Sequence, residues 1–410
     1  YFTRRMRWLS RQVGRCSAAS VAAILKGKSG RRRKRFLRGV EELRREQVRK
    51  KDAAITEMQK LEMYEVDKLA VKEDRGIQFR SVKYNVALAR ELHNVEQKFI
   101  GMHFDGYHPV MKGCTPQQRA ERIAIAASEF ENPRYLLLDH HRFDAHVNKY
   151  ILNEEHKAYL RCRKQKRRGR GAGKKYFAKP RLLARLLKYQ MLNGGRSAGG
   201  IKYECEGKRM SGDINTGLGN SWDNFCIIYS WLDASGIKKC RVFLDGDDSV
   251  VIIERDDFDK LIPLDEHMRD LGMVTEMEYT DDFFKVEFCQ SRPVLEGGRV
   301  TFCRNPHKVL ATIGQSAERL DAPTAVANTR ASALCELAMN GNCAVIGPYC
   351  RRILKSLGDG STYFTAAQLW KAEQYGCKFE APEEKEPDVE NRVSMYRAWG
   401  IDPGYQNALE

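Results

Sequence analysis

The 410-residue sequence lacks the marks of several common protein classes. It has no run of about eighteen apolar residues, so no segment is predicted to cross a bilayer as a helix. Its twelve cysteines include no Cys-x-x-Cys pair and no Cys/His cluster at zinc-ligand spacing, which predicts reduced, buried thiols in a cytosol-like compartment and oxygen ligands for any metal. Internal repeats and a signal-peptide pattern are also absent. Because the chain opens on Tyr1 rather than Met, we expect a fragment that lacks upstream sequence.

Acidic residues are scarce in two stretches, and the positive charge of the chain is concentrated there. Residues 1–50 contain 17 basic and 3 acidic side chains, and residues 161–175 contain nine basic and no acidic ones, within a net charge of +17 for the whole chain. Such concentration favours a nucleic acid as partner over an evenly solvated surface. The alternative is a solubilising tail plus a flexible loop. For residues 31–35, anionic lipid or a protein partner also stays open.

The pattern of apolar and helix-forming residues predicts much of the secondary structure. Residues 31 to about 70 indicate a basic, mostly surface helix or helix pair, and residues 116–130 indicate an amphipathic helix. Residues 135–138 form a short apolar run that is typical of a buried strand. The Gly-rich basic segment 163–175 is predicted to be a flexible loop, and the chain from Ala322 on is predicted to be mainly helical.

Acidic residues occur in two motifs beside apolar runs. Asp139 ends one run and Asp144 follows five positions later, although a strand-end Asp can simply cap the next helix. Gly246, Asp247 and Asp248 separate two β-rich runs, which predicts a hairpin with the acids in its turn. An ordinary turn also favours Asp and Gly. Two adjacent carboxylates between buried strands repel each other unless a cation offsets them, so a divalent metal is the economical explanation.

A third motif combines small and polar residues in the spacing Ser-Gly-x3-Thr-x3-Asn, from Ser211 to Asn220. We predict a helix that begins near Ser211 and places Thr216 and Asn220, four positions apart, on one face. A capped helix with polar residues is the alternative, but this spacing rarely arises by chance.

In this order, the three motifs resemble motifs A, B and C of viral RNA-directed RNA polymerases, and further segments resemble the tombusvirus/carmovirus-like family. The similarity covers about residues 70–320. It implies an α+β fold of the right-hand polymerase type, with fingers, a palm built on an antiparallel sheet and a mainly helical thumb. The implied divisions are a basic, mostly helical N-terminal extension (1–65), fingers with motif F (66–134), a palm with motifs A to E (135–310) that carries a fingers insertion (around 161–205), and a thumb with the C-terminal tail (311–410).

The resemblance also implies roles for individual residues. Two Mg²⁺ (or Mn²⁺) ions are expected on the catalytic, metal-binding carboxylates Asp139, Asp247 and Asp248. Nucleotide binding is expected from Lys72, Arg75 and Arg80 on the triphosphate. Nucleotide binding around the ribose 2′-hydroxyl is expected from Asp144, Ser211, Thr216 and Asn220. RNA binding is expected from Arg163, Lys164, Lys166, Arg167, Arg168, Arg170, Cys289 and Gln290.

The implied function is RNA-directed RNA polymerase, a nucleotidyltransferase that replicates a positive-strand RNA virus genome from ribonucleoside triphosphates. The alternative is a catalytically inert RNA-binding protein with a polymerase-like fold, although such a protein gains nothing from anionic groups where RNA must lie. A metal-dependent nuclease has no need of the Asp144 and Asn220 pair, and Asp144 also argues against a reverse transcriptase, which places an aromatic residue there. We expect the host cytoplasm as location, at membrane-bound replication complexes reached through missing sequence or a membrane-anchoring viral partner.

Overall fold

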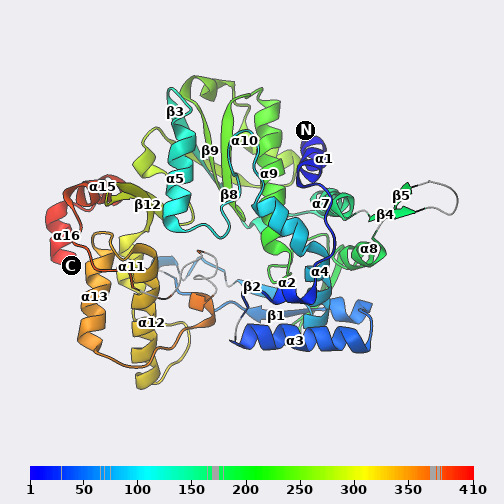
Figure 1. The fold of residues 1–410 in the computed structure, drawn as a ribbon, viewed down its shortest axis with the longest axis horizontal. Helices are drawn as coiled ribbons and strands as arrows, with labels where there is room; N and C mark the ends of the chain where they lie inside the picture. Colours follow the sequence, from blue (N-terminus) through cyan, green and yellow to red (C-terminus); the bar gives the residue numbers. More distant parts are fainter. Residues whose placement is uncertain are drawn as a thin grey trace.

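The computed structural model describes residues 1–28, 30–64, 66–68, 70–73, 75–163, 165–168, 175–178, 180–369, 375, 379 and 381–410. Its centre is a four-stranded antiparallel sheet in the order β10-β3-β9-β8 (Figure 1). These strands span Pro133–His140 (β3), Cys240–Asp245 (β8), Asp248–Glu254 (β9) and Thr275–Thr280 (β10). The predicted buried strand and the predicted hairpin with acids in its turn are both confirmed.

Both faces of the central sheet are buried around β3, β8 and β9, which explains why these three strands contain apolar runs, whereas the edge strand β10 does not. Val242 and Val251 belong to the core that contains helix α9, whereas Phe243 and Val250 belong to the core that contains helix α5. The alternation follows because successive side chains of a strand point to opposite faces. Helix α5 confirms the amphipathic helix predicted within residues 116–130. The flanking helices are α5 (Pro116–Ala127), α9 (Thr216–Ala234) and α10 (Leu264–Asp270), with the 3-10 turns η3 (Arg255–Lys260) and η4 (Phe283–Lys285) nearby.

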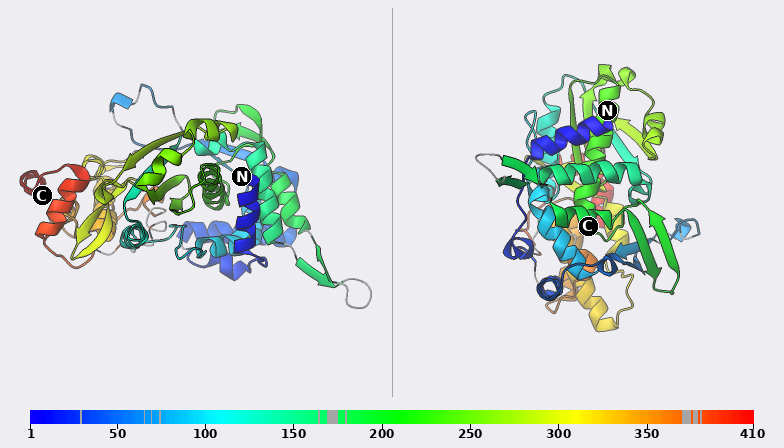
Figure 2. Two further views of the ribbon diagram at one scale, coloured as in Figure 1. Left: turned by 90° about the horizontal axis from the view of Figure 1, so that it is seen from above. Right: turned by 90° about the vertical axis from the view of Figure 1, so that its right-hand side faces the viewer.

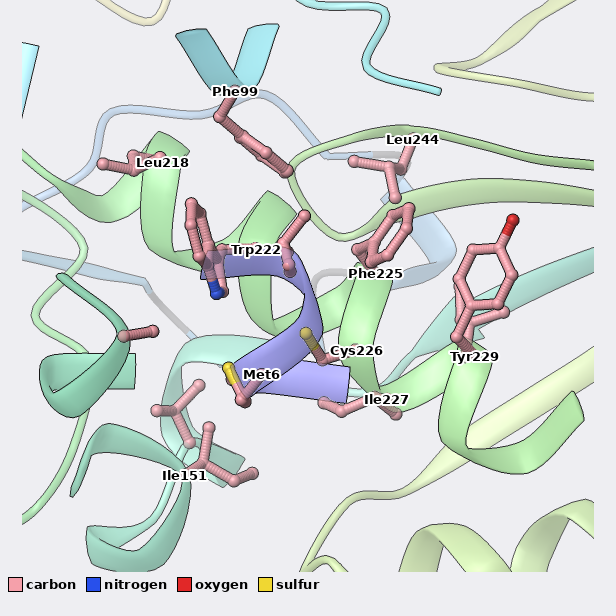
Figure 3. Close-up of a cluster of buried hydrophobic side chains, with 14 of the residues drawn as sticks. Met6, Phe99, Ile151, Leu218, Trp222, Phe225, Cys226, Ile227, Tyr229 and Leu244 are labelled. Atoms are coloured by element: carbon pink, nitrogen blue, oxygen red, sulfur yellow. The ribbon is translucent and has the colours of Figure 1, made fainter. Parts of the chain in front are cut away.

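Helix α9 is the apolar centre of the larger core. Trp222, Phe225 and Cys226 of this helix are 0% exposed. Figure 3 shows them packed with Met6 of helix α1 (Phe2–Val13) and Phe99 of helix α4 (Val82–Ile100). Burying a side chain of this size contributes about 1.5–3 kcal/mol. The first turn of α9, which carries part of the third motif, is therefore attached to a rigid element.

A second four-stranded sheet, in the order β2-β1-β6-β7, lies beside helix α3 (Figure 1). The predicted basic helix is confirmed only in its first half, because α3 ends at Arg45 and residues from Ile55 form β1. Ile55 is 3% exposed, and β1 pairs with β2 and, in parallel, with the distant β6, so tertiary pairing overrides the local helical pattern. The elements of this part are α2 (Val21–Leu25), α3 (Gly30–Arg45), η1 (Lys50–Ala53), β1 (Ile55–Gln59), η2 (Val66–Lys68), β2 (Gly76–Phe79), α6 (Phe143–His146), α7 (Lys149–Cys162), β4 (Gln165–Arg168), β5 (Lys175–Ala178), α8 (Arg181–Lys188), β6 (Leu192–Ser197) and β7 (Lys202–Glu206).

The C-terminal part is mainly helical, as predicted from Ala322 on. A β11–β12 hairpin packs there against α12 and α15 through Val294, Leu337 and Met395. Figure 2 shows this part at one end of the molecule and the β4–β5 hairpin at the other. Its elements are β11 (Ser291–Glu296), β12 (Arg299–Arg304), α11 (Pro306–Thr312), α12 (Ala322–Asn340), α13 (Ile346–Leu357), α15 (Val389–Trp399) and α16 (Pro403–Leu409).

The described residues bear on two predictions from the sequence, one about membrane-spanning helices and one about the cysteines. Among these residues, no helix combines the length and the apolar character that crossing a membrane requires. Apart from Cys335, their cysteines carry free thiols, and all the described cysteines are buried except Cys205 and Cys289, which are partly exposed. The burial predicted for the thiols is therefore confirmed for most cysteines of this part of the chain.

Candidate active site

The acidic motifs meet at one edge of the central sheet. Strands β3 and β9 are antiparallel with Leu138 opposite Ser249, so the next residues on each strand, Asp139 and Asp248, emerge at the same edge. Asp247 lies in the two-residue turn between β8 and β9. The fold thus brings together the carboxylates that the sequence predicted as one site.

Helix α9 holds the acidic turn in place. Ser221 Oγ accepts a hydrogen bond of 2.9 Å from the Gly246 N–H, and Asn224 Nδ2 donates to the carbonyls of Gly246 at 3.3 Å and Asp247 at 2.9 Å. Asn224 Oδ1 also lies 3.0 Å from Nε2 of His140 on β3, so one amide links both acidic motifs. Neither Ser221 nor Asn224 was predicted from the sequence. They could have been found as two polar residues, three apart, beside the apolar Trp222, Phe225 and Cys226.

The site carries unbalanced negative charge. The pKa of Asp248 is raised to about 7, first by the protein atoms that bury its carboxyl group and then by the charges of Asp247, Asp245 and Asp139. In the part of the chain that the structure describes, no three His, Cys, Asp or Glu side chains are grouped so that they alone could hold a metal ion. Mg²⁺ is commonly bound by one or two carboxylates together with substrate phosphates and waters. Asp139, Asp247 and Asp248 offer carboxylate oxygens, the kind of ligand that Mg²⁺ prefers.

A buried ion pair lies directly behind the acidic turn. Arg119 Nη2 of α5 is 2.6 Å from Asp245 Oδ2 of β8, and the two side chains are 2% and 7% exposed. Arg119 Nη1 also donates to the Cys289 sulfur at 3.1 Å. The pKa of the Cys289 thiol is raised, first by burial and then by the charge of Asp248. Helix α5, the acidic hairpin and the segment around Cys289 are thereby fixed to one another.

Cys289 and Gln290 form a tight two-residue turn beside this ion pair. Their φ angles are 52° and 59°, and Phe288 and Ser291 exchange N–H to carbonyl hydrogen bonds across the turn. The left-handed region is unfavourable for residues other than glycine, so the surrounding packing must hold the turn. Gln290 is exposed, whereas the Cys289 thiol contacts Arg119. The predicted RNA contact of these two residues stays a prediction.

Asp144 and Asn220, expected to act on the same hydroxyl, are in direct contact. Asn220 Nδ2 donates to Asp144 Oδ1 at 2.7 Å. Burial raises the pKa of Asp144, while the hydrogen bond from Asn220 and the charge of Arg209 oppose that rise and the charge of Asp247 adds to it. Arg209, which the sequence analysis gave no role, donates to Asn220 and forms buried ion pairs with Glu155 and Asp223.

Helix α9 begins at Thr216, five residues later than predicted, although Thr216 and Asn220 do lie in its first turns. The loop before it must first dock on strand β2, where the Gly212 N–H donates to the Gln78 carbonyl at 2.8 Å. A Cβ at Gly212 would lie 2.5 Å from that oxygen, so only glycine allows this approach. Ser211 Oγ donates to Gln78 Oε1 at 3.0 Å. Thr216 Oγ1 donates to the Met210 carbonyl at 2.8 Å, so the hydroxyls of the motif are held by β2 and by the loop before α9.

Of the three cations predicted to bind triphosphate, two are exposed and one is buried. Lys72 and Arg75 are exposed, and the charge of Arg75 reaches Asp144, where it opposes the rise in pKa. The prediction for Arg80 is wrong, because its side chain is 1% exposed and lies 2.6 Å from Asp213. Its remaining nitrogens donate to Asn193 and to backbone carbonyls. Arg80 therefore ties β2 to β6 and to the loop before α9.

The basic segment predicted to bind RNA includes one buried residue. Arg163 is 1% exposed, with Nη2 at 2.8 Å from Glu91 Oε2 and Nη1 donating to the Cys16 carbonyl at 2.5 Å. Its predicted RNA contact is therefore corrected to a structural role between α7, α4 and the N-terminal segment. Lys166, Arg167 and Arg168 lie in β4, which pairs with β5, so strands form where only a flexible loop was predicted. Lys164 and Arg170 lie outside the described residues.

Comparison with known proteins gives matches along the whole chain. The family described as viral RNA dependent RNA polymerase matches residues 2–410. The chain is 31% identical over 399 residues to the RNA-directed RNA polymerase of Tobacco necrosis virus (strain D), across 93% of this chain and 53% of that protein. It is 30% identical over 435 residues to that of Melon necrotic spot virus (99% and 51%) and 30% identical over 403 residues to that of Turnip crinkle virus (93% and 48%). The chain spans about half the length of these relatives.

Proposed function

The chain belongs to the viral RNA-dependent RNA polymerase family, and on this premise we propose that it synthesises RNA on an RNA template to replicate a tombusvirus-like, positive-strand genome. One observation carries the proposal. The acidic turn between β8 and β9 lies beside the end of β3, and the charge of Asp247 in this turn acts on Asp144, which is hydrogen-bonded to Asn220. Carboxylates suited to metal-assisted phosphoryl transfer thus lie next to a donor and an acceptor suited to a sugar hydroxyl.

The described elements fit a right-hand arrangement. The β10-β3-β9-β8 sheet with α9 takes the place of the palm, together with α5, which was expected in the fingers. The second sheet with α4 and α8 takes the place of the fingers, together with α2 and α3, which were expected in an N-terminal extension, and α7, which was expected in the palm. The helices from α11 on take the place of the thumb. The contacts of Gln78 with Ser211 and Gly212 support this assignment, because they join the second sheet directly to the loop that precedes α9.

Asp139 and Asp247 are the residues that would hold divalent ions, Mg²⁺ or Mn²⁺, with Asp248 as a weaker ligand. The donor set supports this assignment, because hard carboxylate oxygens suit these cations. The repulsion among these carboxylates, which contributes to the raised pKa of Asp248, is relieved by positive charge. When bound, such ions activate an attacking oxygen and offset the charge that develops on the leaving oxygen.

The remaining residues of the site bind and orient the nucleotide. Asp144 and Asn220 offer an acceptor and a donor to the ribose 2′-hydroxyl. A deoxyribonucleotide leaves the second amide hydrogen of Asn220 and the second carboxylate oxygen of Asp144 without a hydroxyl partner and is therefore disfavoured. Lys72 and Arg75 are exposed cations that pair with triphosphate oxygens, Arg75 through two parallel hydrogen bonds.

RNA is assigned to two further elements. The β4–β5 hairpin carries Lys166, Arg167 and Arg168 and contacts template phosphates, which fixes the position of the strand without reading its sequence. The turn of Cys289 and Gln290 contacts the nascent strand near the acidic site. The proximity of Cys289 to Asp248 supports this second assignment.

The test is incorporation of labelled nucleotide on a homopolymeric RNA template, with wild type beside Asp247→Ala and the control Asp256→Ala. Asp256 is an exposed acid in η3. We expect incorporation of the complementary nucleotide by wild type and by the control, and none by Asp247→Ala. Equal incorporation by wild type and Asp247→Ala would contradict the site. No incorporation by a wild-type protein that binds the template would favour the inert RNA-binding protein.

A further inference from the structure

Arg209 lies behind the Asp144 and Asn220 pair and contacts both of its members. Its Nε donates to Asn220 Oδ1 at 3.1 Å, and its backbone N–H donates to the Asp144 carbonyl at 3.2 Å. The Arg209 side chain is 1% exposed. It therefore reaches the pair from the protein interior rather than from the side that is open to a nucleotide.

Two buried acids fix the orientation of the Arg209 guanidinium. Glu155 of α7 accepts hydrogen bonds from Nη1, at 3.3 Å, and from Nη2, and Asp223 of α9 lies 2.9 Å from Nη2. Both carboxylate side chains are 0% exposed. Because the guanidinium is planar and its donors have a fixed fork geometry, these contacts determine where Nε points. Nε points at Asn220.

The contact with Arg209 decides which way the Asn220 amide faces. Arginine has only donors, so the amide atom that faces it is the carbonyl oxygen. The amide nitrogen then faces Asp144, to which it donates at 2.7 Å. In the reversed orientation the oxygen would face the Asp144 carboxylate and the NH₂ group would face the guanidinium, and both contacts are repulsive.

The fixed amide leaves two groups side by side for a ligand. In the part of the chain that the structure describes, no partner takes the second amide hydrogen of Asn220 or the second carboxylate oxygen of Asp144. One is a donor and the other an acceptor. A hydroxyl group satisfies both at once, whereas a C–H group satisfies neither.

Gly219 makes room for this arrangement. A Cβ at position 219 would lie 2.4 Å from Arg209 Nη2 and 2.5 Å from its Cζ, so α9 accepts the guanidinium only because no side chain is present there. Gly217, in the same turn of α9, differs in this respect. A Cβ there would meet only Lys112, with the nearest atom, Nζ, at 3.1 Å at the end of a partly exposed chain.

We propose that Arg209 is a positioning residue for sugar specificity. It fixes the orientation of the Asn220 amide, so that Asn220 and Asp144 together accept a ribose and reject a deoxyribose. The inference rests on the proposed function, whose substrate choice it deepens. Arg209 acts through Asn220 and does not contact the nucleotide.

The test compares ribose with deoxyribose use, measured as the ratio of kcat/KM for ATP to kcat/KM for dATP on a poly(U) template. The variants are Arg209→Lys, which keeps the charge but loses the fork, and Gly219→Ala, which displaces the guanidinium. We expect the ratio to fall about tenfold or more in both, since the hydroxyl contacts carry the discrimination. Gly217→Ala and a change of a distant buried arginine, Arg330→Lys, are expected to keep the wild-type ratio.

The outcomes separate this inference from the proposed function. An equal fall in ATP and dATP use, with the ratio unchanged, overturns the inference, because a purely structural Arg209 affects both substrates alike. Gly219→Ala keeps the charge and the donors of Arg209 and only shifts the guanidinium, so it is a second test where Arg209→Lys does not fold; far-UV circular dichroism checks the fold of both variants. No templated incorporation by wild type refutes the proposed function, and the inference with it.

Discussion

The ion pair between Arg119 and Asp245 gives a quantitative test of how the acidic turn is supported. Arg119→Met keeps most of the apolar stem but removes the cation that lies 2.6 Å from Asp245, where the side chains are 2% and 7% exposed. Removing one partner of a pair this deeply buried costs about 3–5 kcal/mol, because the other charge stays in a medium of low polarity. We expect a loss of unfolding free energy in this range. Asp245→Leu should cost a comparable amount.

The double variant Arg119→Met/Asp245→Leu separates the pair from the packing. Neither charge is then left in the interior, so we expect the double loss to be smaller than the sum of the single losses by roughly 2–3 kcal/mol. Urea unfolding followed by far-UV circular dichroism measures each loss, provided that the slopes of the transitions agree. As a control, Arg269→Met removes an exposed i,i+4 pair with Asp265, whose side chains are 73% and 66% exposed, and should cost no more than about 0.5 kcal/mol. Additive single losses, or equal losses in Arg119→Met and Arg269→Met, would refute the reasoning.

Three other changes probe the loop before α9, a buried histidine and the two kinds of cation. Gly212→Ala should lower both the thermal unfolding midpoint and templated incorporation, because its Cβ would lie 2.5 Å from the Gln78 carbonyl oxygen; an unchanged midpoint would show that the loop can move away. Burial lowers the pKa of His156 to about 4. Between about pH 6.5 and about pH 4, His156 therefore takes up a proton in the unfolded chain but not in the folded chain. The free energy of unfolding falls by roughly 3 kcal/mol across this range. His156→Gln should flatten the pH dependence of the unfolding free energy in that window, and equal slopes would contradict this. Lys72→Met should raise the KM for nucleotide without loss of stability, whereas Arg80→Met should lower the unfolding free energy by about 3 kcal/mol or more; a raised KM for a stable Arg80→Met would restore Arg80 as a phosphate ligand.

The elements that carry the acids could be predicted because their causes are local. The apolar run at residues 135–138 and the Gly246 turn between two β-rich runs each act within about ten positions of the chain. Strands and turns with such strong local signals form where the sequence places them. The resemblance of the three motifs to a known family was also enough to expect Asp139 beside Asp247 and Asp144 beside Asn220, and the structure brings the second pair into direct contact.

The tertiary structure decided which basic side chains are buried and which residues hold the site in place. Nothing in the local sequence distinguishes Arg80 and Arg163 from exposed basic residues. In the folded chain both are buried in ion pairs, Arg80 with Asp213 and Arg163 with Glu91, and these acids belong to distant segments. The network around Arg209 likewise joins α7, α9 and the loop before α9.

By itself, then, the sequence determined the strands and the turn that carry the acidic motifs and the order of those motifs, because spacing and turn chemistry are properties of neighbouring residues. Only the folded chain decided which arginines stay exposed to solvent and which are buried in ion pairs that support the site. Arg80 and Arg163 stay buried because a carboxylate pairs with each guanidinium, and those carboxylates belong to segments that are far from them in the sequence.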